Sequence, residues 1–419
     1  MTGTTPTTDD TATMQSLEQF TAAARAWLDA NAPRRAARAD DAPRQGHGSD
    51  SVALFHNLGH DEERALVDRY RDWQRRKSDA GYGSITWPAE VGGAGLPAAY
   101  EDAFVRCEAD YDTPLFHESI GVSLNIVCPV IEAQGTDEQR TRYVPALRRA
   151  DAMACQLFSE PGAGSDLRAM RTTAVREGSG WRVNGQKVWT SGAQFADWGF
   201  LIARTDGGGS SAFSAFVIDM RAPGVEVRPL RQMTGGSSFN EVFLDDVLVE
   251  DSARIGAVGD GWGAMLTMLN FERAAAAAAD ASEDFAARLV LLARDLGRSA
   301  DPVVRQGVAQ VFVEDRIRDV LKVRGRNAGD PALAAVFSSM GKLAYTDTLA
   351  RASAVASSLL GAQLLADTGR WGTFAWSEFV NGVPGMRLGG GSDEMQRNAI
   401  GERALGLPRD LKPGRGGAR

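Results

Sequence analysis

The pattern of apolar positions divides the chain into three parts. Near the N-terminus, apolar residues recur at helical spacing, which predicts helices at 16–32, 61–81, 98–112, 119–134 and 136–149. From about residue 155, short alternating runs separated by turn residues are typical of β-strands. After Gly261-Trp262 the helical spacing returns, over 264–297, 302–324, 331–367 and 393–404. The predicted order is therefore helical, β, helical.

The β region carries several strand signals in succession. Within Trp181–Trp189, Asn184-Gly185 separates two alternating runs, and because both residue types tolerate positive φ we expect a hairpin turn there. Further predicted strands span 199–204, 212–220, 224–230 and 239–249. Since no helices separate these runs, the pattern favours an antiparallel sheet or a small barrel over a Rossmann fold.

These patterns predict an α+β fold with three domains. We expect an N-terminal α-helical domain at 16–153, a middle antiparallel β domain at 154–255 and a C-terminal four-helix bundle at 256–410. The polar residues 1–15 are expected to form a disordered tail and residues 411–419 a flexible one.

Composition excludes several classes of protein. Among 419 residues, 46 Lys and Arg against 54 Asp and Glu give a net charge of −8, which argues against nonspecific nucleic-acid binding. No run approaches the roughly 18 apolar residues of a membrane span. Three cysteines without a C-x-x-C pair, and a polar acidic start without a signal sequence, predict a cytoplasmic protein. Four scattered histidines predict no metal site.

The loop at the start of the β region has a composition that is suited to binding an anion or a ring. Residues Phe158–Asp166 are rich in small side chains, so their backbone N–H groups can converge on an anion or on the edge of a ring. A tight loop that leads into the β region explains the same residues equally well.

Four runs of the chain closely resemble the acyl-CoA dehydrogenase family, in the family's order and roughly at its spacing. They are Ser159–Asp166, Gly185–Ala193, Phe239–Val249 and Glu394–Asn398. The resemblance extends from about residue 16 to 410 and implies that family's fold. It also implies FAD as the cofactor, and removal of the α proton and β hydride of an acyl thioester, with flavin N5 as hydride acceptor, to give a trans-2-enoyl thioester.

The resemblance also implies partners. The substrate would be an acyl-CoA or acyl-carrier-protein thioester, and the electrons would pass to an electron-transferring flavoprotein. The assembly would be a homodimer, a homotetramer or a heterotetramer, with no nucleic acid and no membrane involved.

The resemblance implies two positions for the catalytic base. Many members carry a Glu before a Gly-Thr near the C-terminus, but here Gly390 stands in that place. Other members carry the base on the first long helix of the C-terminal domain, before an Arg, and here that residue is Glu272. Gly390 keeps its N–H, which in the family donates to the thioester oxygen where enolate charge develops.

The pattern around Glu272 suits a base. Met265, Met268 and Leu269 precede it at helical spacing, so Glu272 is expected in an apolar stripe, where burial raises a carboxyl pKa towards the working pH. A helix carboxylate paired with an Arg is the alternative. Asp393 and Glu394 are rival carboxylates, although capping of a helix explains both.

The resemblance assigns further residues to the cofactor and the substrate. Flavin contacts are implied for Gln156, Phe158, Ser159, Gly164, Ser165, Trp189, Ser191, Gly391, Ser392 and Glu394. Thioester and CoA contacts are implied for Ser165, Asn270 and Arg273. Trp189 has an alternative role as a core aromatic of its hairpin.

The chain departs from the family pattern in two places. The Arg that contacts FAD across the dimer interface remains as Arg294, with Arg305 a further candidate, but the Phe-Gly pair after it is Gly297-Arg298. The family's Gln-x-x-Gly-Gly is replaced by Ser357–Ala362. We therefore expect part of the adenine half of the flavin site to be rebuilt, or to be supplied by a different partner subunit.

Two other functions stay open. One is a flavin monooxygenase on the same fold, against which the retained Glu272 argues. The other is a noncatalytic partner subunit of a heteromeric dehydrogenase, against which the intact Ser159–Asp166 and Trp189–Ser191 runs argue.

The Ala274–Ala279 run suggests a wide cavity for a bulky or branched acyl group.

Overall fold

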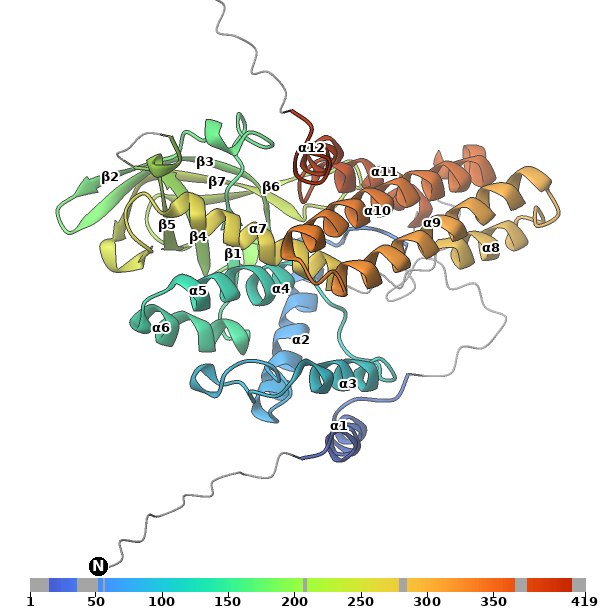
Figure 1. The fold of residues 1–419 in the computed structure, drawn as a ribbon, viewed down its shortest axis with the longest axis horizontal. Helices are drawn as coiled ribbons and strands as arrows, with labels where there is room; N and C mark the ends of the chain where they lie inside the picture. Colours follow the sequence, from blue (N-terminus) through green and yellow to red (C-terminus); the bar gives the residue numbers. More distant parts are fainter. Residues whose placement is uncertain are drawn as a thin grey trace, which may run out of the picture.

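The computed structural model describes residues 15–35, 52–55, 57–205, 209–278, 285–365 and 375–408. N-terminal helices, a β region and a long C-terminal helical region follow one another along the chain, as the sequence predicts (Figure 1). The expected tails lie outside the described residues, except for Gln15. Every helix in the described ranges is too short or too polar to span a lipid bilayer.

The N-terminal region holds six α-helices in its described part: α1 (Leu17–Asn31), α2 (His60–Asp79), α3 (Ala98–Glu108), α4 (Glu118–Gly121), α5 (Cys128–Gln134) and α6 (Asp137–Arg148). Two begin with capping boxes, in which Ser16 pairs with Gln19 and Thr136 with Gln139. The predicted helix at 119–134 is interrupted by a π-helical stretch, Val122–Val127.

The β region forms a sheet whose described strands are β1 (Ala154–Leu157), β2 (Thr173–Glu177), β3 (Gly180–Ser191), β4 (Trp198–Arg204), β5 (Phe213–Asp219), β6 (Val225–Leu230), β7 (Phe239–Glu250) and β8 (Arg254–Ile255). Their order is β6-β7-β3-β2-β4-β5-β8, and β1 pairs with β4. Most pairs are antiparallel, but β4 is parallel to β1 and β2. This topology confirms the antiparallel prediction and excludes a Rossmann fold.

The predicted hairpin turn at Asn184-Gly185 is wrong. β3 continues through both residues, and the turn to β2 lies earlier, between Glu177 and Gly180. At Asn184 the pairing of β3 with β7 shifts register. The side chain of Asn184 exchanges hydrogen bonds with Asp246, whose φ is +54°, so Asn-Gly forms a bulge opposite a kink in β7.

The C-terminal region contains α7 (Gly261–Ala278), α8 (Phe285–Asp295), α9 (Pro302–Arg326), α10 (Pro331–Leu360), α11 (Ala375–Leu388) and α12 (Asp393–Arg403). The predicted helix 264–297 covers all of α8 and α7 from its fourth residue on, and residues 279–284 lie outside the described residues. The sequence pattern misses α11, because Gly382, Pro384 and Gly385 interrupt its helical signal.

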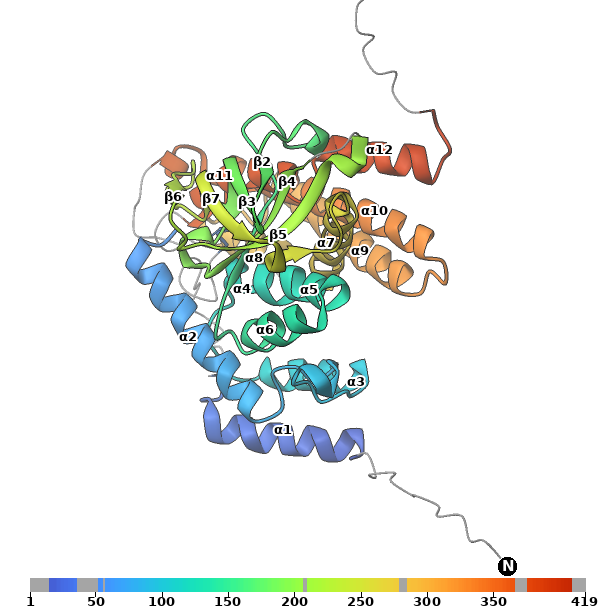
Figure 2. The ribbon, with the colours of Figure 1, turned by 90° about the vertical axis from the view of Figure 1, so that its left-hand side faces the viewer.

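A shared core fixes the β region against its helical neighbours. Residues of α5, α6 and the first half of α7 are buried with those of β4 and β5 in one cluster. α7 lies against the sheet with α5 and α6 close by, and the views of Figures 1 and 2 agree on this arrangement. A separate core of α8, α9, α10 and α11 stabilises the bundle. α7 thus leads from the sheet towards the bundle.

Candidate functional site

Glu272 and Gly390, predicted on separate segments, lie side by side. Met265 and Met268 on α7 are buried against the sheet, and Glu272 continues their stripe one turn later, half-buried. A Cβ built on Gly390 would stand 3.7 Å from Oε1 of Glu272. The turn between α11 and α12 therefore presents its backbone to the carboxylate.

Gln396 holds this turn in place. Gly390 and Gly391 adopt φ values of +64° and +80°, a left-handed conformation that favours glycine. Nε2 of Gln396, a buried side chain on α12, donates to the carbonyl oxygens of Gly390 at 3.0 Å and Gly391 at 3.4 Å. Gln396 belongs to the run Glu394–Asn398 that carries the family resemblance, but the sequence predicted no role for it, because the bonds to Gly390 and Gly391 form only in the folded chain.

Asp393 anchors the start of α12. Its carboxylate is buried and accepts hydrogen bonds from Lys342 Nζ at 2.9 Å, Thr346 Oγ1 at 2.9 Å and Arg387 Nε at 2.7 Å. Burial alone would raise the pKa of Asp393, but these donors outweigh it and hold the pKa below its usual value. A carboxylate with three donors is poorly suited to accept a substrate proton, which argues against Asp393 as a rival base.

A buried ion pair fixes the loop at Phe158–Asp166. Lys187 on β3 is fully buried, with Nζ 2.8 Å from Oε1 of Glu160 and 3.0 Å from the carbonyl oxygen of Phe158. Glu160 also accepts from the backbone N–H groups of Arg171 and Thr172. The Lys187 bonds hold the loop against β3, and the bonds from Arg171 and Thr172 tie it to the segment that precedes β2.

The charges of this pair depend on each other. Burial lowers the pKa of Lys187 to about 8, although Glu160 offsets part of that shift. Burial raises the pKa of Glu160, but Lys187 together with the hydrogen bonds from Thr172 and Arg171 outweighs burial, so the net shift of this pKa is downward. Sequence reasoning missed the pair, because its partners lie in different motifs.

Trp189 is not a core aromatic. Its side chain is 62% exposed, and its φ of +62° is rare for a bulky residue. It lies where the register of β3 and β7 shifts between Lys187 and Thr190. Phe239 contacts its ring edge-on at 6.1 Å between centroids. Strained backbone of this kind occurs often at functional sites.

The other predicted residues are spread over the β region and the C-terminal helical region. On the β region lie half-buried Gln156, Ser159 and Ser191, buried Phe158, and exposed Gly164 and Ser165. Half-buried Ser392 and exposed Glu394 lie at the start of α12, exposed Asn270 on α7 and exposed Arg294 on α8. The side chains of Arg273 and Ala274–Ala279 lie outside the described residues.

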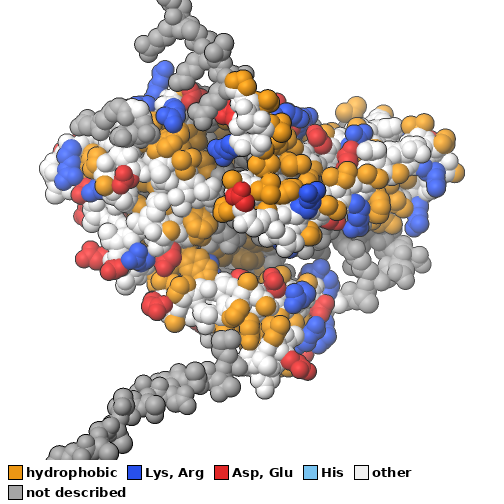
Figure 3. All heavy atoms as spheres, in the orientation of Figure 1, with side chains coloured by type: hydrophobic (Ala, Val, Ile, Leu, Met, Phe, Trp, Pro, Cys, Tyr) orange, Lys and Arg blue, Asp and Glu red, His pale blue; other side chains and the backbone are white. Residues whose placement is uncertain are grey.

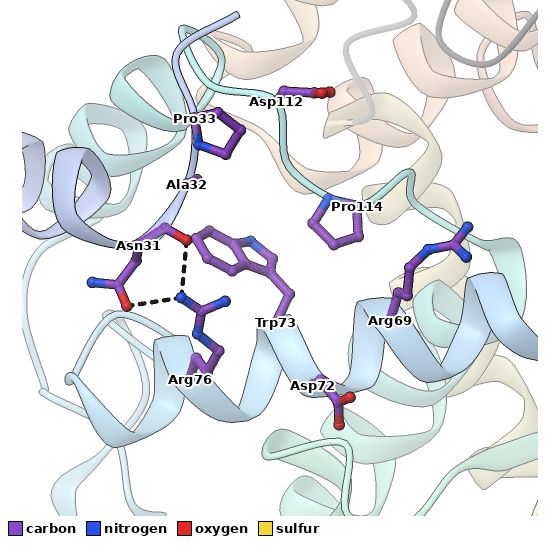
Figure 4. Close-up of a pocket in the computed structure, with 9 residues that line it drawn as sticks. All are labelled: Asn31, Ala32, Pro33, Arg69, Asp72, Trp73, Arg76, Asp112 and Pro114. Carbon is purple, nitrogen blue, oxygen red and sulfur yellow. Dashed lines mark hydrogen bonds between the residues drawn. The ribbon is translucent and has the colours of Figure 1, made fainter.

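A pocket of about 310 Å³ lies elsewhere, between α1 and α2. Trp73 stands at its centre, and Arg76 donates from Nη2 to the backbone oxygen and Oδ1 of Asn31 (Figure 4). None of its lining residues belongs to the predicted site. The pocket therefore plays no part in the arrangement around Glu272.

Family comparison covers most of the chain. Residues 56–151 match the acyl-CoA dehydrogenase N-terminal domain, 155–247 the middle domain and 259–405 the C-terminal domain. A curated relative, acyl-CoA dehydrogenase IpdE1 of Mycobacterium tuberculosis (strain ATCC 25618 / H37Rv), is 33% identical, and the match covers 95% of this chain and 100% of the relative.

Two solved structures share the fold over nearly their full length. The Tcur3481-Tcur3483 steroid ACAD has a TM-score of 0.72 and 25% identity, with 94% of this chain and 98% of that chain covered. The ChsE4-ChsE5 complex from Mycobacterium tuberculosis has a TM-score of 0.69 with the same identity and coverage.

Proposed function

We propose a function on the premise that the chain belongs to the acyl-CoA dehydrogenase family. In this proposal Glu272 is the catalytic base, and the product of the reaction is a trans-2-enoyl thioester. The family consists of FAD-dependent oxidoreductases that act on CH–CH bonds. The observation that carries the proposal is the position of the Glu272 carboxylate beside the backbone of Gly390.

The residues present fit a flavin. The Lys187–Glu160 pair holds the Phe158–Asp166 loop against β3, and a Cβ on Gly164 would meet nothing within 4 Å, so this backbone is open to a ligand. Trp189 offers an exposed aromatic ring from a strained bulge. We assign the flavin to these residues, to Gln156 and Ser191 on β1 and β3, and to Gly391, Ser392 and Glu394 at the start of α12. When bound, FAD supplies the hydride acceptor.

The chain's own groups carry the proton transfer. Glu272 takes the α proton of the acyl thioester, because its carboxylate stands at the end of a buried apolar stripe. The N–H of Gly390 donates to the thioester oxygen, where negative charge develops; one such donor typically contributes about 3 kcal/mol of transition-state stabilisation. Gln396 fixes the turn that carries this N–H.

The glycine beside Glu272 favours a bulky acyl group. Gly390 adds no side chain beside the carboxylate. One solved neighbour is titled a steroid ACAD, and relatives that match 64% and 57% of this chain are cyclohexane-1-carbonyl-CoA dehydrogenases. We therefore propose branched or ring-bearing acyl thioesters of CoA or of a carrier protein. Activity confined to short straight chains would contradict this choice.

An apolar face on α9 supports an oligomer. Val313, Ile317 and Val320 on α9 are each about half exposed, at spacings that place them on one face, and Val323 extends it. Figure 3 shows apolar side chains along the C-terminal helices. Contiguous apolar surface of this kind typically marks an interface. We propose a second copy or a related subunit as its partner, with Arg294 directed to the flavin of that partner.

Anaerobic bleaching of the bound flavin tests the proposed function. The purified protein, with any copurifying subunit, is mixed with straight, branched and ring-bearing acyl-CoA thioesters, and the enoyl product is identified. Bleaching with enoyl product supports the dehydrogenase, with an electron-transferring flavoprotein as physiological acceptor. An oxygen-dependent hydroxylated product indicates a monooxygenase instead. A chain without bound flavin indicates a noncatalytic subunit.

A further inference from the structure

A buried chain of hydrogen bonds joins α2 to the end of β3. Glu63 on α2 is 3% exposed, and its carboxylate faces His117 Nε2 at 2.9 Å and Gln194 Nε2 at 3.3 Å. Oε1 of Gln194 accepts from Nδ2 of Asn240, a fully buried residue of β7. Nδ2 of Asn240 also donates to the carbonyl oxygen of Thr190 at 3.0 Å.

The direction of these bonds follows from one backbone donor. The N–H of Ser119 donates to Nδ1 of His117 at 3.2 Å, so Nδ1 accepts and the ring presents a donor at Nε2. Glu63 thus accepts from His117 on one side and from Gln194 on the other. A carboxylate at this position accepts from both His117 and Gln194. The amide of a Gln would instead turn its own N–H groups towards one of these two donors.

The backbone after Ser191 lies close to the same helices. A Cβ on Gly192 would stand 2.2 Å from Cβ of Ser119 on α4, so this approach requires glycine. The ring of Phe195 stacks on His60 of α2 at 5.5 Å between centroids and meets His117 edge-on at 6.0 Å. The stretch from Gly192 to Phe195, directly after Ser191, is therefore held against α2 and α4.

We propose that Glu63 is a positioning residue for the flavin. Through Gln194 and Asn240 it sets Thr190, and with Thr190 the adjoining Ser191, relative to the N-terminal helices. This inference rests on the proposed function in one respect: the flavin lies against Ser191. It adds that a buried carboxylate of α2, in a different part of the fold, determines how tightly and in which orientation β3 holds the ring.

Binding of FAD to the full-length apoprotein tests the proposal without any substrate. Glu63→Gln and Gln194→Met each remove a bond of the chain, and Asp68→Asn changes an exposed carboxylate on the same helix as a control. We expect both network variants to raise the Kd for FAD about tenfold and to change the visible circular dichroism of the flavin, while Asp68→Asn changes neither. Network variants with a wild-type Kd and spectrum would overturn the proposal, even if their melting temperature falls.

A double variant tests whether the effect passes through Ser191. In a Ser191→Ala background, Glu63→Gln should raise the Kd for FAD by less than twofold, because the contact that it positions is gone. Fully additive effects would overturn this route. If Glu63→Gln weakens FAD binding but no thioester bleaches the flavin of the wild type, the dehydrogenase function is rejected and the positioning role of Glu63 stands. Protein that binds no FAD would reject both.

Discussion

Oε1 of Glu272 lies 3.7 Å from the position that a Cβ on Gly390 would occupy, so two segments distant in sequence meet at one place. The family resemblance offers both positions for the base, and the fold explains why both are suitable. A carboxylate that starts from α7 reaches the place that a side chain from the α11–α12 turn would enter. If Glu272 is the base, as proposed, the base has changed segments while the turn has kept its N–H.

Substitution of Gly390 by Ala should restrict the acyl group. A Cβ there is strained by the φ of +64°, at a cost of about 1–2 kcal/mol, and it adds bulk beside Glu272. We expect kcat/KM for ring-bearing thioesters to fall at least tenfold more than kcat/KM for short straight ones. Steady-state kinetics on both substrate classes measures this ratio, and an equal loss for the two classes would contradict the proposed substrate.

Gln396 should matter for turnover more than for stability of the whole chain. Gln396→Leu removes the donor that holds the carbonyl oxygens of Gly390 and Gly391, so the N–H of Gly390 loses its fixed direction. We expect kcat to fall about tenfold, which corresponds to roughly 1.4 kcal/mol. Arg403→Gln, at an exposed position of the same helix, is the control and should leave kcat unchanged.

The sequence predicts the order of elements better than it predicts their connections. The run 199–204 corresponds to β4 and 239–249 to β7, because alternation and strand composition are local properties. Asn184-Gly185 fails as a turn because its outcome depends on Asp246, which pairs with it from β7. α11 is missed because Gly382, Pro384 and Gly385 interrupt its local helical signal, and packing in the bundle core stabilises the helix despite them.

The candidate site divides in the same way. Periodicity places Glu272 in an apolar stripe, and the resemblance implies that Glu272 and Gly390 serve the same substrate, but only the folded structure shows how closely they approach. Lys187 with Glu160, and Glu63 with Gln194, are contacts between distant segments that leave no periodic signal. Such pairs require the folded structure.

The buried Lys187 should make the free energy of unfolding depend on pH in the alkaline range. Its pKa is about 8 in the folded chain, while an unfolded lysine titrates near 10.4, so between these values the unfolded chain binds more protons. The free energy of unfolding of the wild type should therefore rise with pH across that window, by about 1–3 kcal/mol, relative to a Lys187→Met/Glu160→Gln double variant. Denaturant unfolding at pH 7.5 and pH 10 measures it, and a difference that is constant over this range would contradict the shift.

The apolar face of α9 should hold the assembly together. Ile317→Glu and Val320→Glu each place a charge on this face, and burial of an unpaired charge in an interface is strongly unfavourable. We expect sedimentation velocity to show dissociation to smaller species at micromolar protein. Arg326→Glu adds negative charge at the end of the same helix and should leave the assembly intact. If all three variants sediment as the wild type does, α9 is not the interface.

The central claim is that Glu272 removes the α proton. Stopped-flow anaerobic reduction of the flavin by a saturating acyl-CoA, compared between wild type and Glu272→Gln with equal FAD content, tests it most directly. The amide keeps the shape of the side chain but cannot accept the proton, so the rate of flavin reduction should fall by about a thousandfold. A Glu272→Gln variant that reduces its flavin at the wild-type rate would contradict the claim.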